Sequence, residues 1–117
     1  MGKTVLDGIG LYRAKIERRE RQREELEAVK KVIKPETYKR VKGDIYKDIK
    51  SSTKKLQQTE AIIENHPHEL QKEILYYKWV QGMTFSKIAE TLAYSERHII
   101  REHGKAIKAI NSKYPPD

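Results

Sequence analysis

Basic side chains recur along one side of a predicted helix in the last third of the sequence, at residues 95–110. On a helical wheel of about 100° per residue, that side holds Arg97, Arg101, Gly104, Lys105 and Lys108. The opposite, apolar side holds Ile99, His103, Ala106 and Ile110. A helix that is buried on one side and basic on the other can present guanidinium groups to base edges and ammonium groups to phosphates. The pattern therefore predicts binding of double-stranded DNA.

The side chains of this region suit different contacts. Base edges are assigned to Arg97, His98 and Arg101. Phosphates are assigned to Lys87, Lys105 and Lys108. Further backbone contacts are expected from Thr84 and Ser86, and Ser95 and Gly104 complete the predicted DNA-binding residues. Gly104 allows two interpretations, either a close approach of the helix to the duplex or a helix weakened by about 1 kcal/mol relative to alanine.

Two acidic residues in the same stretch do not block this assignment. The wheel places Glu96 toward the core side of the first turn, where the helix dipole and free backbone N–H groups favour a carboxylate. Glu102 is expected on the flank of the helix, away from the bases. The predicted reading face is therefore basic.

A short helix and a turn must position the basic helix. Apolar residues at i, i+3, i+4 and i+7 predict a helix over residues 85–92, which Thr84 can cap. Ala93 and Tyr94 form the turn, with alanine where glycine is usual, and Ser95 is a suitable N-cap for the next helix. This order of elements predicts a helix-turn-helix, whose second helix enters the major groove.

Residues 73–110 resemble the C-terminal domain of sigma factor region four and, more closely, phage late-transcription regulators of the ArpU and RinA type. The resemblance rests on Tyr76-Tyr77, on Ile88-Ala89 with Leu92, on Ser95-Glu96-Arg97, and on the basic residues Lys105 and Lys108. It departs from the family pattern at Ala93, His98 and His103. Such a resemblance implies sequence-specific DNA binding and activation of phage or mobile-element genes, with RNA polymerase as a further partner.

The rest of the chain also predicts helices, and the expected class is all-α. A first helix is expected from a start near Asp7–Gly10 to Lys34, where Pro35 disfavours helical angles in the preceding residue. From Pro35 the periodicity predicts one long helix, or two short ones joined near Ser51-Ser52, followed by a third helix that Gly82 ends. The predicted domains are a basic helical hairpin at 1–65 and a DNA-binding domain at 66–114.

Charge and composition narrow the classes of partner. The net charge of +8 favours a polyanion. Residues 1–65 hold 17 basic and 11 acidic residues, a net +6, whereas 84–117 hold six and four, a net +2. The dense lysines of residues 30–55 are either a second phosphate-contacting surface, a dimer arm, or a solvated face, and we prefer the last. No apolar run approaches the roughly 20 residues of a membrane span, and no signal-like segment opens the sequence, so a cytoplasmic location without membrane contact is expected.

Other chemistry finds little support in the residue types. The absence of cysteine excludes disulfides and thiolate zinc sites. His66, His68, His98 and His103 lack metal-site spacing, and no nucleophile, base and orienting acid stand together. We expect no metal, no cofactor and no enzymatic activity.

Two other functions are compatible with the sequence. A small terminase subunit for DNA packaging is also helical and carries a helix-turn-helix, although there the reader commonly comes first. A sigma-like module could instead bind RNA polymerase without reading DNA. A homodimer is a further candidate, since two-fold operators mirror dimeric readers.

Overall fold

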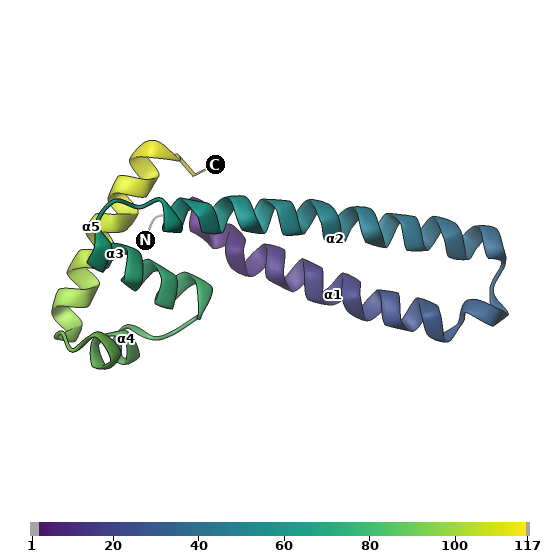
Figure 1. The fold of residues 1–117 in the computed structure, drawn as a ribbon, viewed down its shortest axis with the longest axis horizontal. Coiled ribbons are helices and arrows are strands. Elements are labelled where there is room, and N and C mark those ends of the chain that lie inside the picture. Colours follow the sequence, from purple (N-terminus) through teal and green to yellow (C-terminus); the bar gives the residue numbers. More distant parts are fainter. Residues whose placement is uncertain (1–2, 117) are drawn as a thin grey trace. The chain divides into compact units, whose positions relative to one another are not determined.

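All regular structure among residues 3–116, which the computed structural model describes, is helical. The α-helices are α1 (Gly8–Ala28), α2 (Pro35–Glu64), α3 (Glu69–Leu75), α4 (Phe85–Leu92) and α5 (Glu96–Lys113) (Figure 1). The predicted all-α class is therefore confirmed. Within the described residues, none of these helices combines the length and the hydrophobicity that a membrane span requires.

The chain divides into two compact units. One is Gly10–Gln57, which we name the α1–α2 unit. The other combines the residues up to Ile9 with those from Gln58 onward, and we name it the α3–α5 unit. The predicted domain ranges, 1–65 and 66–114, stay a prediction.

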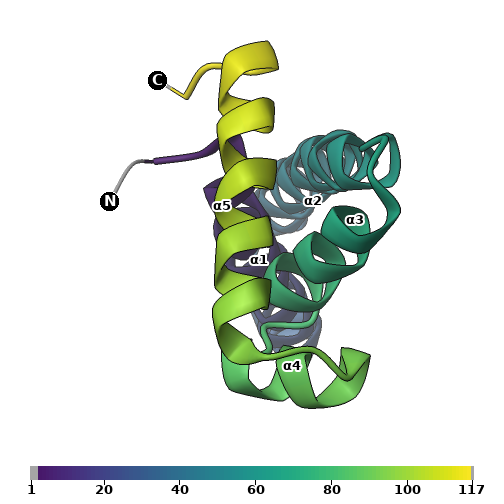
Figure 2. The same ribbon diagram turned by 90° about the vertical axis from the view of Figure 1, so that its left-hand side faces the viewer.

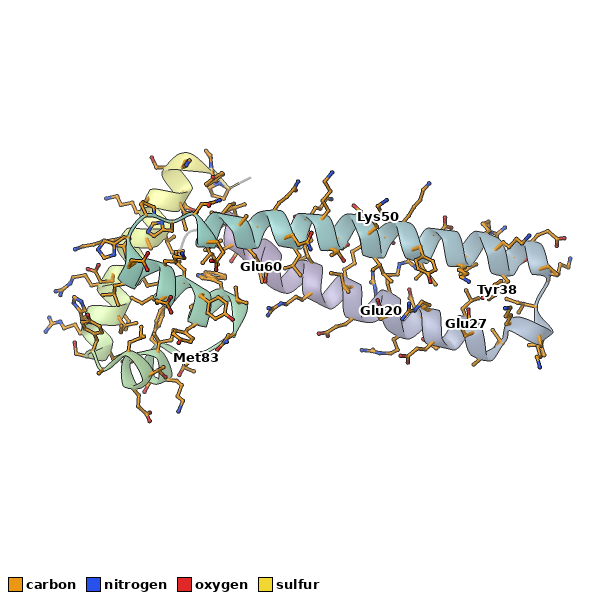
Figure 3. The ribbon with its side chains drawn as sticks, viewed as in Figure 1. Glu20, Glu27, Tyr38, Lys50, Glu60 and Met83 are labelled. Atoms are coloured by element: carbon orange, nitrogen blue, oxygen red, sulfur yellow. The ribbon has the colours of Figure 1, made fainter. Side chains whose placement is uncertain are left out.

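In the α1–α2 unit, the two helices run side by side in opposite directions (Figure 1). Their buried cluster is small, consisting of Leu26, Tyr38 and Ile45. The Tyr38 hydroxyl donates a hydrogen bond to the Glu27 carboxylate close to the connection between the helices (Figure 3). Farther along, Arg19 of α1 forms an ion pair of 2.6 Å with Asp48 of α2. Polar contacts as well as apolar packing thus join these two helices.

The first helix ends earlier than the sequence predicts. α1 stops at Ala28, and a 3-10 turn follows at Lys30–Val32, so the expected end at Lys34 is wrong. Pro35 restricts only the residue before it, whereas the reversal of the chain needs several non-helical residues. Ile33 is accordingly extended, with φ −115° and ψ 162°. The second helix is continuous through Ser51-Ser52, so the alternative of two short helices is wrong.

In the α3–α5 unit, three helices enclose one apolar cluster. Its buried members are Ile74 from α3, Ile88 and Ala89 from α4, and Ile99 from α5. Leu70, Tyr77, Met83, Phe85 and Leu92 pack around this cluster. Figure 2 shows α3 beside α5, with α4 at the N-terminal end of α5. The periodic apolar residues predicted for α4 and α5 are therefore the residues that join these helices.

A wider helical turn separates α3 from α4. Residues Tyr76–Val80 form a π-helical segment, in which the Gln81 N–H donates to the Tyr76 carbonyl at 3.2 Å. Gly82 follows with φ +68°, a left-handed conformation that glycine adopts without the steric cost of a Cβ. The predicted role of Gly82 as the end of the third helical stretch is consistent with this conformation.

Candidate nucleic-acid interface

The sequence signals at the starts of α4 and α5 are confirmed. The Thr84 hydroxyl accepts a hydrogen bond of 3.2 Å from the Lys87 N–H, and the Ser95 hydroxyl accepts one of 3.1 Å from the His98 N–H. Each bond satisfies a backbone donor that the first helical turn leaves unpaired. Thr84 and Ser95 are thus exposed capping residues, and Ser86 is exposed in the first turn of α4.

Ala93 makes the turn between α4 and α5 in a left-handed conformation. Its φ is 61° and its ψ is 43°, and it is the only non-glycine residue with positive φ within residues 3–116. The backbone N–H groups of Ala93 and Tyr94 both donate to the Ala89 carbonyl. These bonds satisfy a carbonyl at the end of α4 and hold the turn, although an L-residue here costs roughly 1–2 kcal/mol.

One side of α5 presents the basic residues that the wheel grouped. Arg97, Arg101, Lys105 and Lys108 are all exposed, as is Gly104. A Cβ at Gly104 would meet no atom within 4 Å, so internal packing does not require glycine at this position. Opposite, Ile99, Ala106 and Ile110 are buried in the α3–α5 unit. The helix therefore separates a packed side from a solvated basic side.

Not all the lysines on this surface are free of partners. The Lys105 ammonium lies 3.2 Å from a Glu102 carboxylate oxygen, and the Lys87 ammonium lies 3.8 Å from the Glu90 carboxylate. Both side chains of the Lys87–Glu90 pair are exposed, and such ion pairs are weak, about 0.3–0.5 kcal/mol. A phosphate could therefore compete for Lys87 at small cost, whereas Lys105 is paired with a buried carboxylate.

Glu102 is buried, whereas the sequence places it on the flank. Only 6% of the residue is exposed, and its carboxylate accepts a 3.2 Å hydrogen bond from the Gln71 side-chain amide. That bond and the one from Lys105 lower the pKa of Glu102. Gln71 lies in α3, 31 residues away in sequence, so no local pattern could have indicated this partner. Glu96 differs in the other direction, because it is exposed rather than turned to the core.

Next to the basic side, Tyr94, His98 and Arg101 form a connected group. The rings of Tyr94 and His98 stack with centroids 5.0 Å apart and an interplanar angle of 26°. The Arg101 guanidinium lies 2.9 Å from the His98 Nδ1. The Arg97 side chain has no hydrogen bond or ion pair within residues 3–116. The two arginines that were predicted to read bases therefore differ in how they are held.

Ile100 is a surface residue that the sequence reasoning missed. The residue is 47% exposed and lies at the edge of the basic side of α5. Ile100 follows the buried Ile99 directly, so the apolar doublet could be assigned to the core as a whole. The signal that separates them is the 100° step between neighbours on a helix, which moves Ile100 away from the core direction.

His103 belongs to an aromatic cluster beside α5. Its Nε2 accepts a 3.1 Å hydrogen bond from the Trp79 indole N–H, and the Phe85 ring meets it edge-on at 4.9 Å. Burial, followed by the nearby Lys78 charge, lowers the pKa of His103 to about 4. The imidazole is therefore neutral at pH 7. The expectation that His103 is a partly buried packing residue is confirmed.

A cleft of about 500 Å³ opens next to this cluster, entirely within the α3–α5 unit. Its apolar lining comes from Trp79, Phe85, Ile100 and Ile107. Within the described part of the chain, no group of three or more histidine and carboxylate side chains is arranged to hold a metal ion. In comparisons with known proteins, no family model, no curated protein and no solved structure matches this chain.

Proposed function

We propose that the chain is a sequence-specific DNA-binding transcriptional regulator, with α4 and α5 as a helix-turn-helix and α5 as the helix that enters the major groove. The observation that carries this proposal is the one-sided surface of α5, which is basic and exposed on the side opposite its buried contacts. In this proposal α1 and α2 form an N-terminal hairpin, and α3–α5 correspond to the sigma region-four-like bundle that the sequence resembles.

The geometry supports distinct roles along α5. Arg97 and Arg101 lie in its first two turns, where a recognition helix contacts base edges. The free N–H groups and the dipole at the start of a helix attract phosphate, and Ser95 and Thr84 stand at two such starts. Lys108 lies farther along the same side and would meet the backbone. The resemblance supports activation of phage or mobile-element genes as the biological role.

The direct test is binding to a duplex selected from random sequence by the full chain. Replacing both arginines, Arg97→Ala with Arg101→Ala, should weaken binding to that duplex at least tenfold, because each bidentate arginine–guanine pair contributes roughly 1–3 kcal/mol. A matched control replaces two exposed basic residues of α2, Arg40→Ala with Lys50→Ala. Unchanged affinity in the α5 variant, with its helical content and thermal unfolding intact, would contradict the proposal.

A second candidate function is a protein-interaction module that binds RNA polymerase without reading DNA. The apolar cleft beside His103 favours it, because a cleft lined by exposed or half-buried apolar side chains suits a partner's apolar side chain. Capture of RNA polymerase by the full chain, combined with no shift of any duplex at low salt, would select this candidate over the first. A homodimer is proposed only with the first candidate, and paired half-sites in selected duplexes would reveal it.

A further inference from the structure

The hydrogen bond between Arg101 and His98 determines which ring nitrogen of the imidazole carries a proton. A guanidinium can only donate, so the His98 Nδ1 at 2.9 Å from the Arg101 Nη2 must be the acceptor. The ring N–H of the neutral imidazole is then on Nε2. His98 is therefore neutral when this bond is made, and it offers Arg101 an acceptor while the Tyr94 ring stacks on its face.

Two structural features restrict His98 itself. Its backbone N–H is bound by the Ser95 hydroxyl, which places it in the capped first turn of α5. Its ring lies against Tyr94, whose backbone is fixed by the bond to the Ala89 carbonyl. The acceptor that holds Arg101 is thus attached to two local structures that hydrogen bonds hold, the cap and the turn.

We propose that His98 and Tyr94 are positioning residues that hold Arg101 in the orientation for reading a guanine. This inference rests on the proposed DNA-binding function and assigns His98 a different role from the base contact predicted from sequence. One of the five guanidinium N–H groups goes to His98, and the remaining four include a parallel pair. Guanine presents the N7 and O6 acceptors of the major groove in the arrangement that suits such a pair.

Arg97 provides the internal comparison, because it is on the same side of α5 but its side chain has no hydrogen-bond or ion-pair partner within residues 3–116. An arginine without a partner loses its rotational freedom when it binds, at a cost of about 0.5–1.5 kcal/mol per immobilised side chain. Arg101 is already held before binding. Loss of the His98 acceptor should therefore weaken guanine recognition by Arg101 about two- to twelvefold and leave the contact made by Arg97 unchanged.

The experiment uses the full chain and the duplex that it selects from random sequence. Each guanine of that duplex is replaced in turn by 7-deazaguanine, which lacks the N7 acceptor, or by inosine, which keeps both major-groove acceptors. We expect one guanine at which 7-deazaguanine weakens wild-type binding and inosine does not. In Arg101→Ala, the same replacement should have no further effect.

Two substitutions of His98 separate positioning from general structure. His98→Leu removes the acceptor, and His98→Asn keeps an oxygen where Nδ1 lies. We expect His98→Leu to bind the selected duplex about two- to twelvefold more weakly than wild type, because Arg101 recognises its guanine less well. His98→Asn should recover most of the lost affinity, and the two variants should have equal thermal stability.

The outcomes distinguish this inference from the proposed function. A chain that enriches no sequence would overturn both. Enrichment of a site without a guanine sensitive to Arg101, or equal discrimination by wild type and His98→Leu, would overturn the positioning role alone. Equal losses in His98→Leu and His98→Asn would do the same, because the acceptor would then be irrelevant.

Discussion

The two units use charged residues in different ways. In the α1–α2 unit, charges are distributed along both helices, and several are engaged inside the unit. Lys42 lies over the Tyr38 ring, and a hydrogen bond with Tyr38 raises the pKa of its ammonium. In the α3–α5 unit, the basic residues of α5 gather on the side that faces away from the apolar cluster.

This difference shows that net charge alone does not locate a binding surface. Residues 1–65 carry an excess of six positive charges, three times the excess of two in residues 84–117. Some of the basic residues behind the first excess are paired within the unit, as where Arg19 holds the pKa of Asp48 below its usual value. The basic residues behind the smaller excess lie mostly on one side of α5, and the packed core fixes the direction in which that side faces.

The largest expected effect comes from the core that fixes this direction. Ile99 is fully buried against Ile74 and Ile88, so Ile99→Ala should lower the free energy of unfolding by about 2–5 kcal/mol. Ile45→Ala in the α1–α2 unit should cost less, because the cluster there is smaller and its other members, Leu26 and Tyr38, are each 8% exposed, whereas Ile74 and Ile88 are fully buried. Urea unfolding of both variants measures the difference.

The single tryptophan sharpens this test, because Trp79 lies in the α3–α5 unit. Its fluorescence reports that unit, whereas far-ultraviolet circular dichroism reports all the helices. Coincident transitions would show that the two units unfold together. A larger loss for Ile45→Ala than for Ile99→Ala would contradict the ranking of the two cores.

A smaller effect is expected from acid, and it belongs to the α3–α5 unit. The pKa of His103 is about 4 in the folded chain against an ordinary 6.5, so below pH 6.5 the unfolded chain binds the proton first. The free energy of unfolding should therefore fall as the pH drops from 6.5 toward 4, by at most about 1.4 kcal/mol per pH unit.

His103→Phe should remove this contribution to the pH dependence of the free energy of unfolding, since phenylalanine keeps an aromatic ring that does not titrate. His98→Asn is a matched loss of one histidine outside the buried cluster. Measurements between pH 6.5 and 5 avoid the range in which Glu102 loses its own contribution, because its pKa lies below the ordinary 4.5. An unchanged slope in His103→Phe would show that this imidazole is not the group responsible.

The smallest effect concerns the turn that orients α5. Because Ala93 has a φ of 61°, Ala93→Gly should relieve strain and raise the free energy of unfolding by about 0.5–1 kcal/mol. Gly82→Ala, at φ +68°, is the matched opposite change and should lower it by a similar amount. Thermal unfolding of the two variants should shift in opposite directions. A shift in the same direction would mean that backbone strain does not govern these turns.

Local sequence signals predicted where α4 and α5 begin, but they did not predict where α1 ends or where the π-helical segment lies. The capping side chains of Thr84 and Ser95 could be read directly, because a cap depends on a few neighbouring residues. The end of α1 could not, since Pro35 indicates where helix is forbidden but not where the chain begins to reverse. The π-helical segment Tyr76–Val80 also carried no recognised signal.

In the candidate site, too, features set by neighbouring residues could be predicted, whereas features set by distant residues could not. Periodicity grouped the basic residues of α5, whereas the burial of Glu102 depends on Gln71 in another helix. The bond between His98 and Arg101 has i, i+3 spacing and was within reach of sequence reasoning. Its geometry was not, because the stacking of Tyr94 requires the left-handed turn at Ala93.

The most direct measurement is the salt dependence of DNA affinity in two matched lysine pairs, one from each unit. For wild type, the logarithm of the binding constant should fall linearly with the logarithm of salt concentration, at about 0.9 per phosphate contacted. Lys105→Gln with Lys108→Gln on α5 should reduce that slope by up to about 1.8, and Lys47→Gln with Lys50→Gln on α2 should leave it unchanged. A reduced slope only in the α2 pair would contradict the account and assign DNA binding to the α1–α2 unit.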